Sequence, residues 1–328
     1  MADPPFMDLR LDWNAGESAR ADKWDGLLAR AGKSSLEQSW AYGAAMEAIS
    51  RRRVRRGILS DDAGPLAAVQ AFERRVTGLG TLVQITRGPV WLRPDISPAH
   101  IAAGMNLIRA AWRITRRELV LWMPELPDTS ESHAIMRGLG ARRMITGYSS
   151  AWIDLQCDED TLRGALTGKW RNKLKAAEAS RLRVETATGA TTGSVGAALD
   201  WLLGEYEPFR RKKRFMGPDA QLIRALAGSA PRQSRPMVFL AYDRRRPVAG
   251  ILILRHGNAA TYSIGWTGPD GRTQRAHHLL LWRAMGAMKN AGIDWFDVGG
   301  LFASNAPGVA RFKLGMGGEL FTLAGTFI

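Results

Sequence analysis

The sequence contains a single cysteine, Cys157, and this scarcity excludes an intramolecular disulfide. One thiol fits a reducing compartment, so a cytoplasmic location is expected. No run approaches the ~18 consecutive apolar residues of a membrane-spanning helix. The first ten residues, MADPPFMDLR, have no apolar core of the kind a signal peptide needs. Hydrophobic residues still make up 45% of the chain, which excludes wholesale disorder.

Several catalytic chemistries lack their usual residues. None of the five histidines has metal-ligand spacing with Cys, Asp or Glu, so no metal site is expected. His277 and His278 are adjacent on a predicted helix and cannot chelate one ion as an i, i+4 pair would, so a structural or surface role is expected for them. There is no Walker A loop, no dinucleotide-binding GxGxxG and no GxSxG elbow. Acidic neighbours raise the pKa of the Cys157 thiol and argue against a nucleophilic thiolate.

Acidic residues are fewer than basic ones: 31 Asp and Glu stand against 46 Lys and Arg, a net charge of +15. An excess of this size favours a polyanionic partner, which could be nucleic acid, a phosphorylated substrate or an anionic membrane face. Alternatively, the excess of basic residues reflects the amino-acid usage of an arginine-rich genome and indicates no particular partner, since arginine, alanine and glycine are all abundant. The distribution of the charges therefore matters more than their sum.

The length of 328 residues predicts two domains, and the same order of elements occurs in both halves. Each half has a hairpin, a further strand, a helix and a closing strand. In the first half these elements are predicted at 54–59, 66–73, 83–92, 97–115 and 118–123, followed by a second helix to Leu139. In the second half they are predicted at 237–242, 248–255, 260–266, 274–290 and 293–298. The pattern predicts an α/β protein with domains 1–150 and 151–328.

A basic, helix-rich segment is predicted between the halves, at 159–216. Its apolar residues Leu166, Trp170, Leu174 and Ala177 recur with helical spacing. The polar side of that helix carries a cationic ridge of Lys169, Arg171, Lys173 and Lys175. A second cluster, Arg210–Arg214, follows Tyr206 and Phe209 directly. Dense like charges repel each other unless a counter-anion is near, although each cluster could also be an ordinary solvated face.

Two loops of the second half have the position in which α/β sheets bind ligands, where strands end and helices begin. One is GWTGPDGRTQRAHH (265–278), with Arg272 and Arg275 at the start of its helix. The other is FDVGGLFASNAPGVARFKLGMGG (296–318), which leaves a strand through two glycines and reaches Phe312 and Lys313.

These segments resemble a known family. KWRNKLKAAEASRLRVE (169–185), TYSIGWTGPDGRTQRAHHLLLWRAM (261–285), GIDWFDVGG (292–300) and GVARFKLGMGG (308–318) are similar to the FemABX family of non-ribosomal peptidyl (aminoacyl) transferases. QSWAYGAAME (38–47) fits the start of that family's first domain. The resemblance covers nearly the whole chain in the right order. It implies two GNAT-like domains, each a mixed sheet with flanking helices, with the active cleft between them or on the second. No sustained heptad is present, so the coiled-coil arm of some members is not expected.

The resemblance also implies partners and roles. Such enzymes transfer an amino acid from aminoacyl-tRNA to the amino group of a peptidoglycan-precursor peptide, and a transient contact with a membrane-bound precursor is a further expectation. Lys313 matches the family's lysine for the oxyanion, and Phe312 matches the aromatic before it. Tyr262 corresponds to a tyrosine near the substrate. Arg210, Arg211 and Lys212 lie where a basic residue meets the acceptor's phosphates. The expected substrate-binding set is completed by Asp297, Arg272 and Arg275, and the ridge 169–175 is expected to contact tRNA phosphates.

The chemistry of that reaction agrees with the residues present. An aminoacyl ester is already activated, so its aminolysis needs no metal and no cofactor, and none is expected. It needs an amine held close to the carbonyl and a cation or N–H groups for the developing oxyanion. Met123 stands where some relatives have an acidic residue, so no carboxylate general base is predicted. The acceptor could also be another peptide, an amine or a natural-product scaffold.

Two other functions stay open at this stage. A GNAT-type N-acyltransferase would use acyl-CoA or a carrier-bound acyl group. It would need a Gln/Arg-x-x-Gly-x-Gly/Ala loop for a pyrophosphate, and 271–278 lacks those glycines. A non-catalytic nucleic-acid-binding module would fit the net charge, but few aromatic residues alternate with the basic ones.

Overall fold

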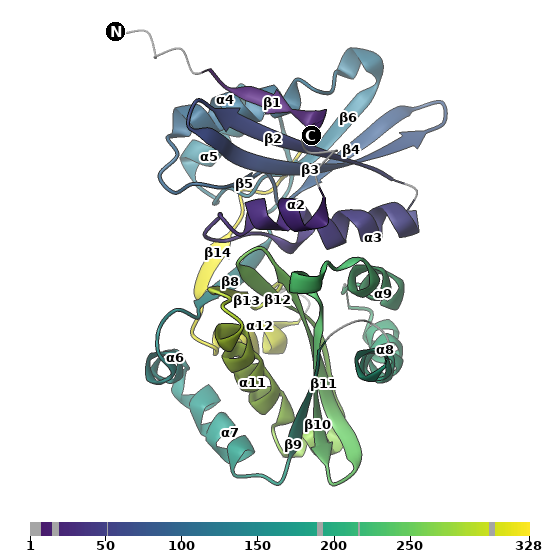
Figure 1. Ribbon diagram of the computed structural model, residues 1–328, viewed down its shortest axis with the longest axis vertical. Coiled ribbons are helices and arrows are strands. Elements are labelled where there is room, and N and C mark those ends of the chain that lie inside the picture. The colour runs from purple at the N-terminus through teal and green to yellow at the C-terminus, as the bar shows by residue number, and fades with distance from the viewer. Residues whose placement is uncertain (1–7, 15–19, 51, 189–192, 216, 302–305) are drawn as a thin grey trace. The chain divides into compact units, whose positions relative to one another are not determined.

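The computed structural model describes residues 8–14, 20–50, 52–188, 193–215, 217–301 and 306–328 (Figure 1). These residues form two compact units, one reaching Tyr148 and including Thr322–Ile328, the other comprising Ser149–Phe321. Each unit is a mixed sheet with helices on both faces. The sequence places the last seven residues in the second domain, whereas they belong to the first unit, because strand β15 (Thr326–Phe327) pairs with strands of the first sheet.

The first sheet has the order β1-β2-β3-β4-β6-β15-β7, with β5 paired to β3. Its other strands are β1 (Arg10–Asp12), β2 (Arg53–Asp61), β3 (Gly64–Val76), β4 (Gly80–Thr86), β5 (Val90–Trp91), β6 (Glu118–Met123) and β7 (Arg143–Ile145). The helices are α2 (Ala21–Leu28), α3 (Trp40–Ser50), α4 (Pro98–Arg109) and α5 (Ser130–Gly138), with short 3₁₀ turns at 36–38 and 114–116. Alternate residues of β3 face opposite helix layers: Val69 packs in the core formed with α4 and α5, while Ala68 packs with Trp24 of α2.

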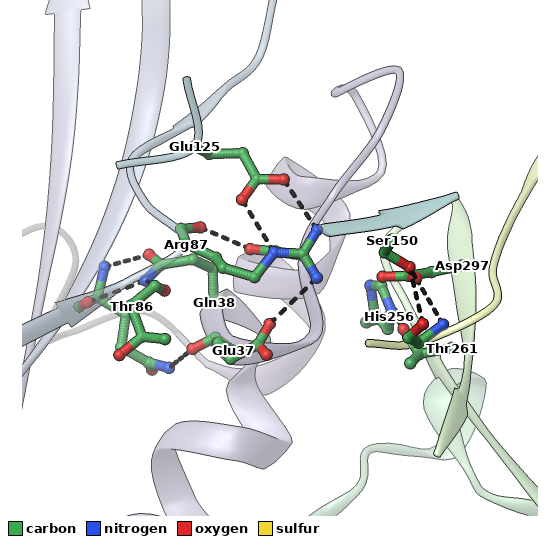
Figure 2. Close-up of polar contacts among 12 residues, drawn as sticks. Glu37, Gln38, Thr86, Arg87, Glu125, Ser150, His256, Thr261 and Asp297 are labelled. Carbon is green, nitrogen blue, oxygen red and sulfur yellow. Dashed lines mark hydrogen bonds and ion pairs between the residues drawn. The ribbon is translucent and has the colours of Figure 1, made fainter. Parts of the chain in front are cut away.

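The predicted strand 83–92 is interrupted in the structure. Arg87 has a φ of 51°, a left-handed conformation that ends β4 before β5 begins. The Arg87 side chain is 2% exposed and donates to Glu125 through Nε and a terminal nitrogen, at 3.0 and 2.9 Å (Figure 2). Ser35 Oγ donates to the Arg87 carbonyl at 2.7 Å. A buried guanidinium is tolerated here because a carboxylate meets it in two places.

The second sheet has the order β14-β8-β13-β12-β11-β10-β9. Its strands are β8 (Ser149–Asp154), β9 (Arg183–Thr188), β10 (Met237–Asp243), β11 (Arg246–His256), β12 (Ala259–Thr267), β13 (Trp295–Asp297) and β14 (Glu319–Thr322). The helices are α6 (Glu159–Ala165), α7 (Gly168–Glu178), α8 (Ser194–Lys213), α9 (Ala220–Ser229), α10 (Pro269–Thr273), α11 (Ala276–Asn290) and α12 (Pro307–Leu314), and a 3₁₀ turn spans 232–234. In the described part of the chain, no helix has the length and apolar character needed to cross a bilayer.

The repeated order of elements is confirmed. Hairpin β2–β3, strand β4, helix α4 and strand β6 in the first unit correspond to β10–β11, β12, α11 and β13 in the second. In both units the third and the closing strand pair in parallel, as a connection through a helix requires. The predicted α/β class, with two mixed sheets and flanking helices, is therefore correct.

The segment 159–216 is not a separate insertion between the halves. It contains β9, which pairs along its whole length with β10 and forms an edge of the second sheet. Residues 189–192 and Met216 lie outside the described part. The predicted apolar stripe is buried, with Trp170 and Leu174 of α7 in the core against α11. α8 covers the opposite face of the sheet. Its Trp201 packs so closely there that a Cβ added at Gly250 would lie 3.0 Å from the Trp201 ring. Asp158 caps α6 by accepting from the Thr161 N–H at 2.7 Å.

Candidate functional site

The second sheet opens between β12 and β13. The two strands pair in parallel only from Ala259 to Thr261, opposite Trp295–Asp297; β13 then ends, while β12 continues to Thr267. The chain leaves β13 through Gly299, whose φ is +73°. A Cβ at Gly299 would lie 2.7 Å from the Tyr262 carbonyl oxygen, so this close approach requires glycine. The carboxyl end of β13 and the middle of β12 therefore lie side by side.

Lys313 reaches this opening from α12. Its side chain is 9% exposed, and Nζ donates to the Gly300 carbonyl at 3.0 Å. Nζ also lies 5.3 Å from the centre of the Tyr262 ring, in the range of a cation–π contact. Burial lowers the pKa of Lys313 to about 8, and the nearby Asp297 carboxylate opposes that shift. The residue is thus a partly desolvated ammonium at neutral pH, with N–H donors besides the one used by Gly300.

Asp297 holds the turn after β13. It is fully buried, and its Oδ1 accepts the Ser150 hydroxyl and the Gly299 N–H, the latter at 2.8 Å (Figure 2). Ser150 Oγ also lies 3.1 Å from the Gly299 carbonyl. The resemblance implies a substrate contact for Asp297, which stays a prediction; the bonds seen here direct its Oδ1 at the turn that positions Gly300. Sequence patterns do not identify Ser150, because a serine near the start of a strand has no distinguishing neighbours.

Tyr262 forms a hydrogen-bonded group with two residues. Its hydroxyl lies 2.8 Å from His277 Nε2, and His277 Nδ1 lies 2.5 Å from Thr267 Oγ1. Burial raises the pKa of Tyr262 and lowers the pKa of His277 to about 4, with the charges of His278 and Lys313 adding to the second shift. The sequence analysis predicts a structural or surface role for His277, and in the structure its ring lies against Tyr262. Its position at the start of the helix that follows β12 is the signal that could have identified it.

Phe312 packs in an aromatic cluster that joins α12 to α7 and α11. Its ring centre lies 4.9 Å from His278, 5.7 Å from His277 and 6.0 Å from Trp170. Burial lowers the pKa of His278 to about 4, and the charges of Lys173 and Arg275 add to this. The cluster fixes the start of α7 and the end of α12 around Lys313.

Two of the three predicted phosphate-binding residues of α8, Arg210 and Arg211, already have a partner. Arg210 and Arg211 donate to Glu207 Oε1 at 2.7 and 2.8 Å, while Lys212 is exposed at the end of the helix. The hydrogen bond from Arg210, followed by that from Arg211, lowers the pKa of Glu207 to about 2. Tyr206, one turn earlier, is fully buried, and its hydroxyl donates to the Pro218 carbonyl at 2.9 Å. A phosphate at these arginines would compete with Glu207.

The cations of α7 and of the 265–278 loop are exposed. With 100° per residue, Lys169 and Lys173 lie on one flank of the buried stripe, and Arg171 and Lys175 lie on the other, so the predicted ridge is divided in two. Arg272 and Arg275 are exposed on the loop, and Arg275 has a φ of 57°.

Among the described residues, no group of three or more His, Cys, Asp or Glu side chains could hold a metal ion. Two hollows of the second unit are lined by residues other than Lys313 and Tyr262. One, of about 430 Å³, is lined by Arg181, Asp243, Asp270 and the hairpin 244–246; the other, of about 540 Å³, lies between α8 and β9–β10.

Comparison with known proteins identifies the class of fold. Residues 167–314, from α7 to α12, match the family described as acetyltransferase (GNAT) domain. No curated protein matches the sequence. The structure of FemX is similar with a TM-score of 0.77 and 14% identity, over 98% of this chain and 96% of that one. The structure of L-PGS from Bacillus licheniformis has a TM-score of 0.55 and 15% identity, over 95% of this chain and 92% of that one. A tandem GNAT protein from the clavulanic acid biosynthesis pathway has a TM-score of 0.53 and 12% identity, over 98% of both chains.

At these identities the solved structures show the fold. The chain has a GNAT-like fold of the FemX kind, as the resemblance in sequence implies. The GNAT match over the segment that contains Tyr262, His277 and Lys313 supports an acyltransferase.

Proposed function

We propose that the protein is an aminoacyltransferase that moves an amino acid from aminoacyl-tRNA to the amino group of a peptide acceptor, such as a peptidoglycan precursor. The observation that carries this proposal is Lys313, a buried ammonium beside Tyr262 at the opening between β12 and β13. The FemX-like fold supports it, as do the exposed cations of α7 and α8, which suit tRNA or acceptor phosphates.

The reaction proceeds in two steps, addition of the amine and departure of the ribose oxygen. The acceptor amine attacks the ester carbonyl carbon, forming the C–N bond and a tetrahedral oxyanion. The C–O bond to the ribose then breaks, and the ribose oxygen takes up the proton that the amine gives away. Lys313 can donate to the oxyanion while keeping its bond to Gly300, because an ammonium has three N–H donors. Proton transfer through water or through the substrate itself serves in place of a carboxylate base.

The test compares two lysines that both donate to backbone carbonyls. Lys313→Ala is expected to lower kcat roughly 100- to 1000-fold, because one donor to the oxyanion is lost. Lys289→Ala is the matched control: Lys289 Nζ donates to the Leu155 and Cys157 carbonyls at 2.8 and 2.7 Å, so its loss costs stability and leaves the rate unchanged. Transfer from charged tRNA to a precursor peptide, followed by mass spectrometry, measures the effect, and RNase treatment should abolish it. Equal rates for both variants, or transfer that survives RNase with acyl-CoA as donor, would contradict the proposal.

A GNAT-type N-acyltransferase that uses acyl-CoA or a carrier-bound donor is the second candidate, and the family match at 167–314 favours it. The loop before α11 argues against it. The N–H groups of Arg272, Gln274 and Arg275 donate to backbone carbonyls at 3.0–3.1 Å, so they are engaged where a pyrophosphate would need free donors. Titration calorimetry with coenzyme A distinguishes the two functions, since micromolar binding would favour the second.

A further inference from the structure

A β-bulge in β12 decides which way Tyr262 faces. Two consecutive residues of β11 pair with Ile264 and Tyr262, so Ser263 is an extra residue in β12. In a regular strand, Tyr262 and Gly265 would lie on opposite faces, because they are three positions apart. The extra residue brings Tyr262 onto the same face as Gly265 and Thr267, which is the face covered by α11.

On that face Thr267, His277 and Tyr262 form a continuous chain of hydrogen bonds. The two contacts, at 2.5 and 2.8 Å, use both ring nitrogens of His277. Gly265 lies beneath the imidazole: a Cβ there would be 2.4 Å from the Tyr262 hydroxyl and 2.7 Å from His277 Cε1. The chain therefore needs the bulge, the glycine and the first turn of α11 together.

The imidazole of His277 is neutral at neutral pH, since burial and the charges of His278 and Lys313 lower its pKa to about 4. A neutral imidazole donates from one nitrogen and accepts at the other. Thr267 Oγ1 is the partner of Nδ1 and the Tyr262 hydroxyl is the partner of Nε2, so one hydroxyl donates to the ring and the other accepts from it. Without Thr267, a buried ring nitrogen would lose its partner, and the ring could change tautomer or rotate.

We propose that Thr267 and His277 are positioning residues that hold the Tyr262 hydroxyl and ring beside Lys313 during acyl transfer. The inference rests on the proposed function, because Tyr262 takes part only if transfer occurs at Lys313. It assigns a role to a histidine and a threonine that touch no reacting atom themselves.

The first measurement does not depend on activity. The chain has five tyrosines, so NMR of protein labelled at tyrosine Cζ gives few lines, and Tyr262→Phe identifies the line of Tyr262. Thr267→Val is expected to shift or broaden that line, and Thr267→Ser to restore it, because serine keeps the hydroxyl. Ser97→Ala is the matched control: it removes a hydroxyl 2.7 Å from Nδ1 of His100 in the first unit and should leave the Tyr262 line unchanged.

The second measurement is kinetic. Thr267→Val is expected to lower kcat about tenfold with little change in KM, which corresponds to the loss of one hydrogen bond. Thr267→Ser should recover most of the rate, and Ser97→Ala should leave it unchanged while lowering the unfolding midpoint. Thr267→Val should have no further effect in a Tyr262→Phe background, because both changes break the same chain.

Each result decides a different point. An unchanged Tyr262 line in Thr267→Val, or a shifted line with an unchanged kcat, would overturn the positioning role. If the wild-type protein transfers nothing from aminoacyl-tRNA, the proposed function fails instead. The tyrosine line then still decides whether Thr267 and His277 hold Tyr262.

Discussion

Lys313 shows how burial tunes a single residue for the proposed reaction. Its pKa of about 8 leaves most of the side chain charged at pH 7. Because the oxyanion needs the ammonium form, we expect kcat to fall as the pH rises through about 8. In Lys313→Arg, the guanidinium stays charged and this alkaline limb should disappear. A pH–rate profile of both proteins measures this, and the same alkaline limb in the arginine variant would assign it to another group.

The same lowering of the Lys313 pKa reduces the stability of the folded protein. Its pKa is about 8 when folded and 10.5 as a free side chain, so between these values the unfolded chain binds more protons. Stability due to this group therefore rises with pH from 8 to 10.5, and the cost below pH 8 is of the order of 3 kcal/mol. Lys313→Met should remove this rise without unfolding the protein, as urea denaturation at pH 7 and pH 10 would reveal. A variant less stable than wild type at both pH values would indicate a structural lysine.

At the scale of elements, the turn after β13 positions the site. Gly299→Ala should destabilise the protein by about 1–2 kcal/mol, since φ is +73° and the added Cβ would lie 2.7 Å from the Tyr262 carbonyl. It should also lower kcat by moving Gly300 away from Lys313. Gly286→Ala in α11 is the control, because no atom lies within 4 Å of its added Cβ and alanine favours a helix. Denaturant midpoints and kcat are measured for both variants. If Gly299→Ala changed neither quantity, the turn after β13 would tolerate a side chain at this position.

The elements that could be predicted were those with periodic patterns. Strand 118–123, the paired hairpins and the long helix of the second unit follow from alternation and helical spacing. The place of His277 at the start of the helix after β12 could be predicted, but its contact with Tyr262 could not, because a bulge at Ser263 changes the facing of Tyr262 without changing composition. Resemblance singled out Lys313, but its burial depends on α7, α11 and α12 packing together. The hydrogen bond between Asp297 and Ser150 cannot be predicted either, because the two residues lie 147 positions apart in the chain.

At the scale of the whole molecule, the chain ends in the unit where it began. Phe327 is 2% exposed in the core of the first unit, whereas Phe321 stacks on Trp152 in the second, with ring centres 5.8 Å apart. β15 has only two residues, too few to show an alternating pattern. Its pairing with the first sheet therefore cannot be predicted from the sequence. Phe327→Ala should cost about 3–5 kcal/mol and lower hydrogen-exchange protection in β6 and β7 but not in β10–β12. Phe321→Ala should instead loosen β8, with a smaller cost, because its ring is only half-buried. If Phe327→Ala reduced protection equally in both sheets, the two units would unfold as one cooperative body, and the division at Tyr148 and Phe321 would have no energetic counterpart.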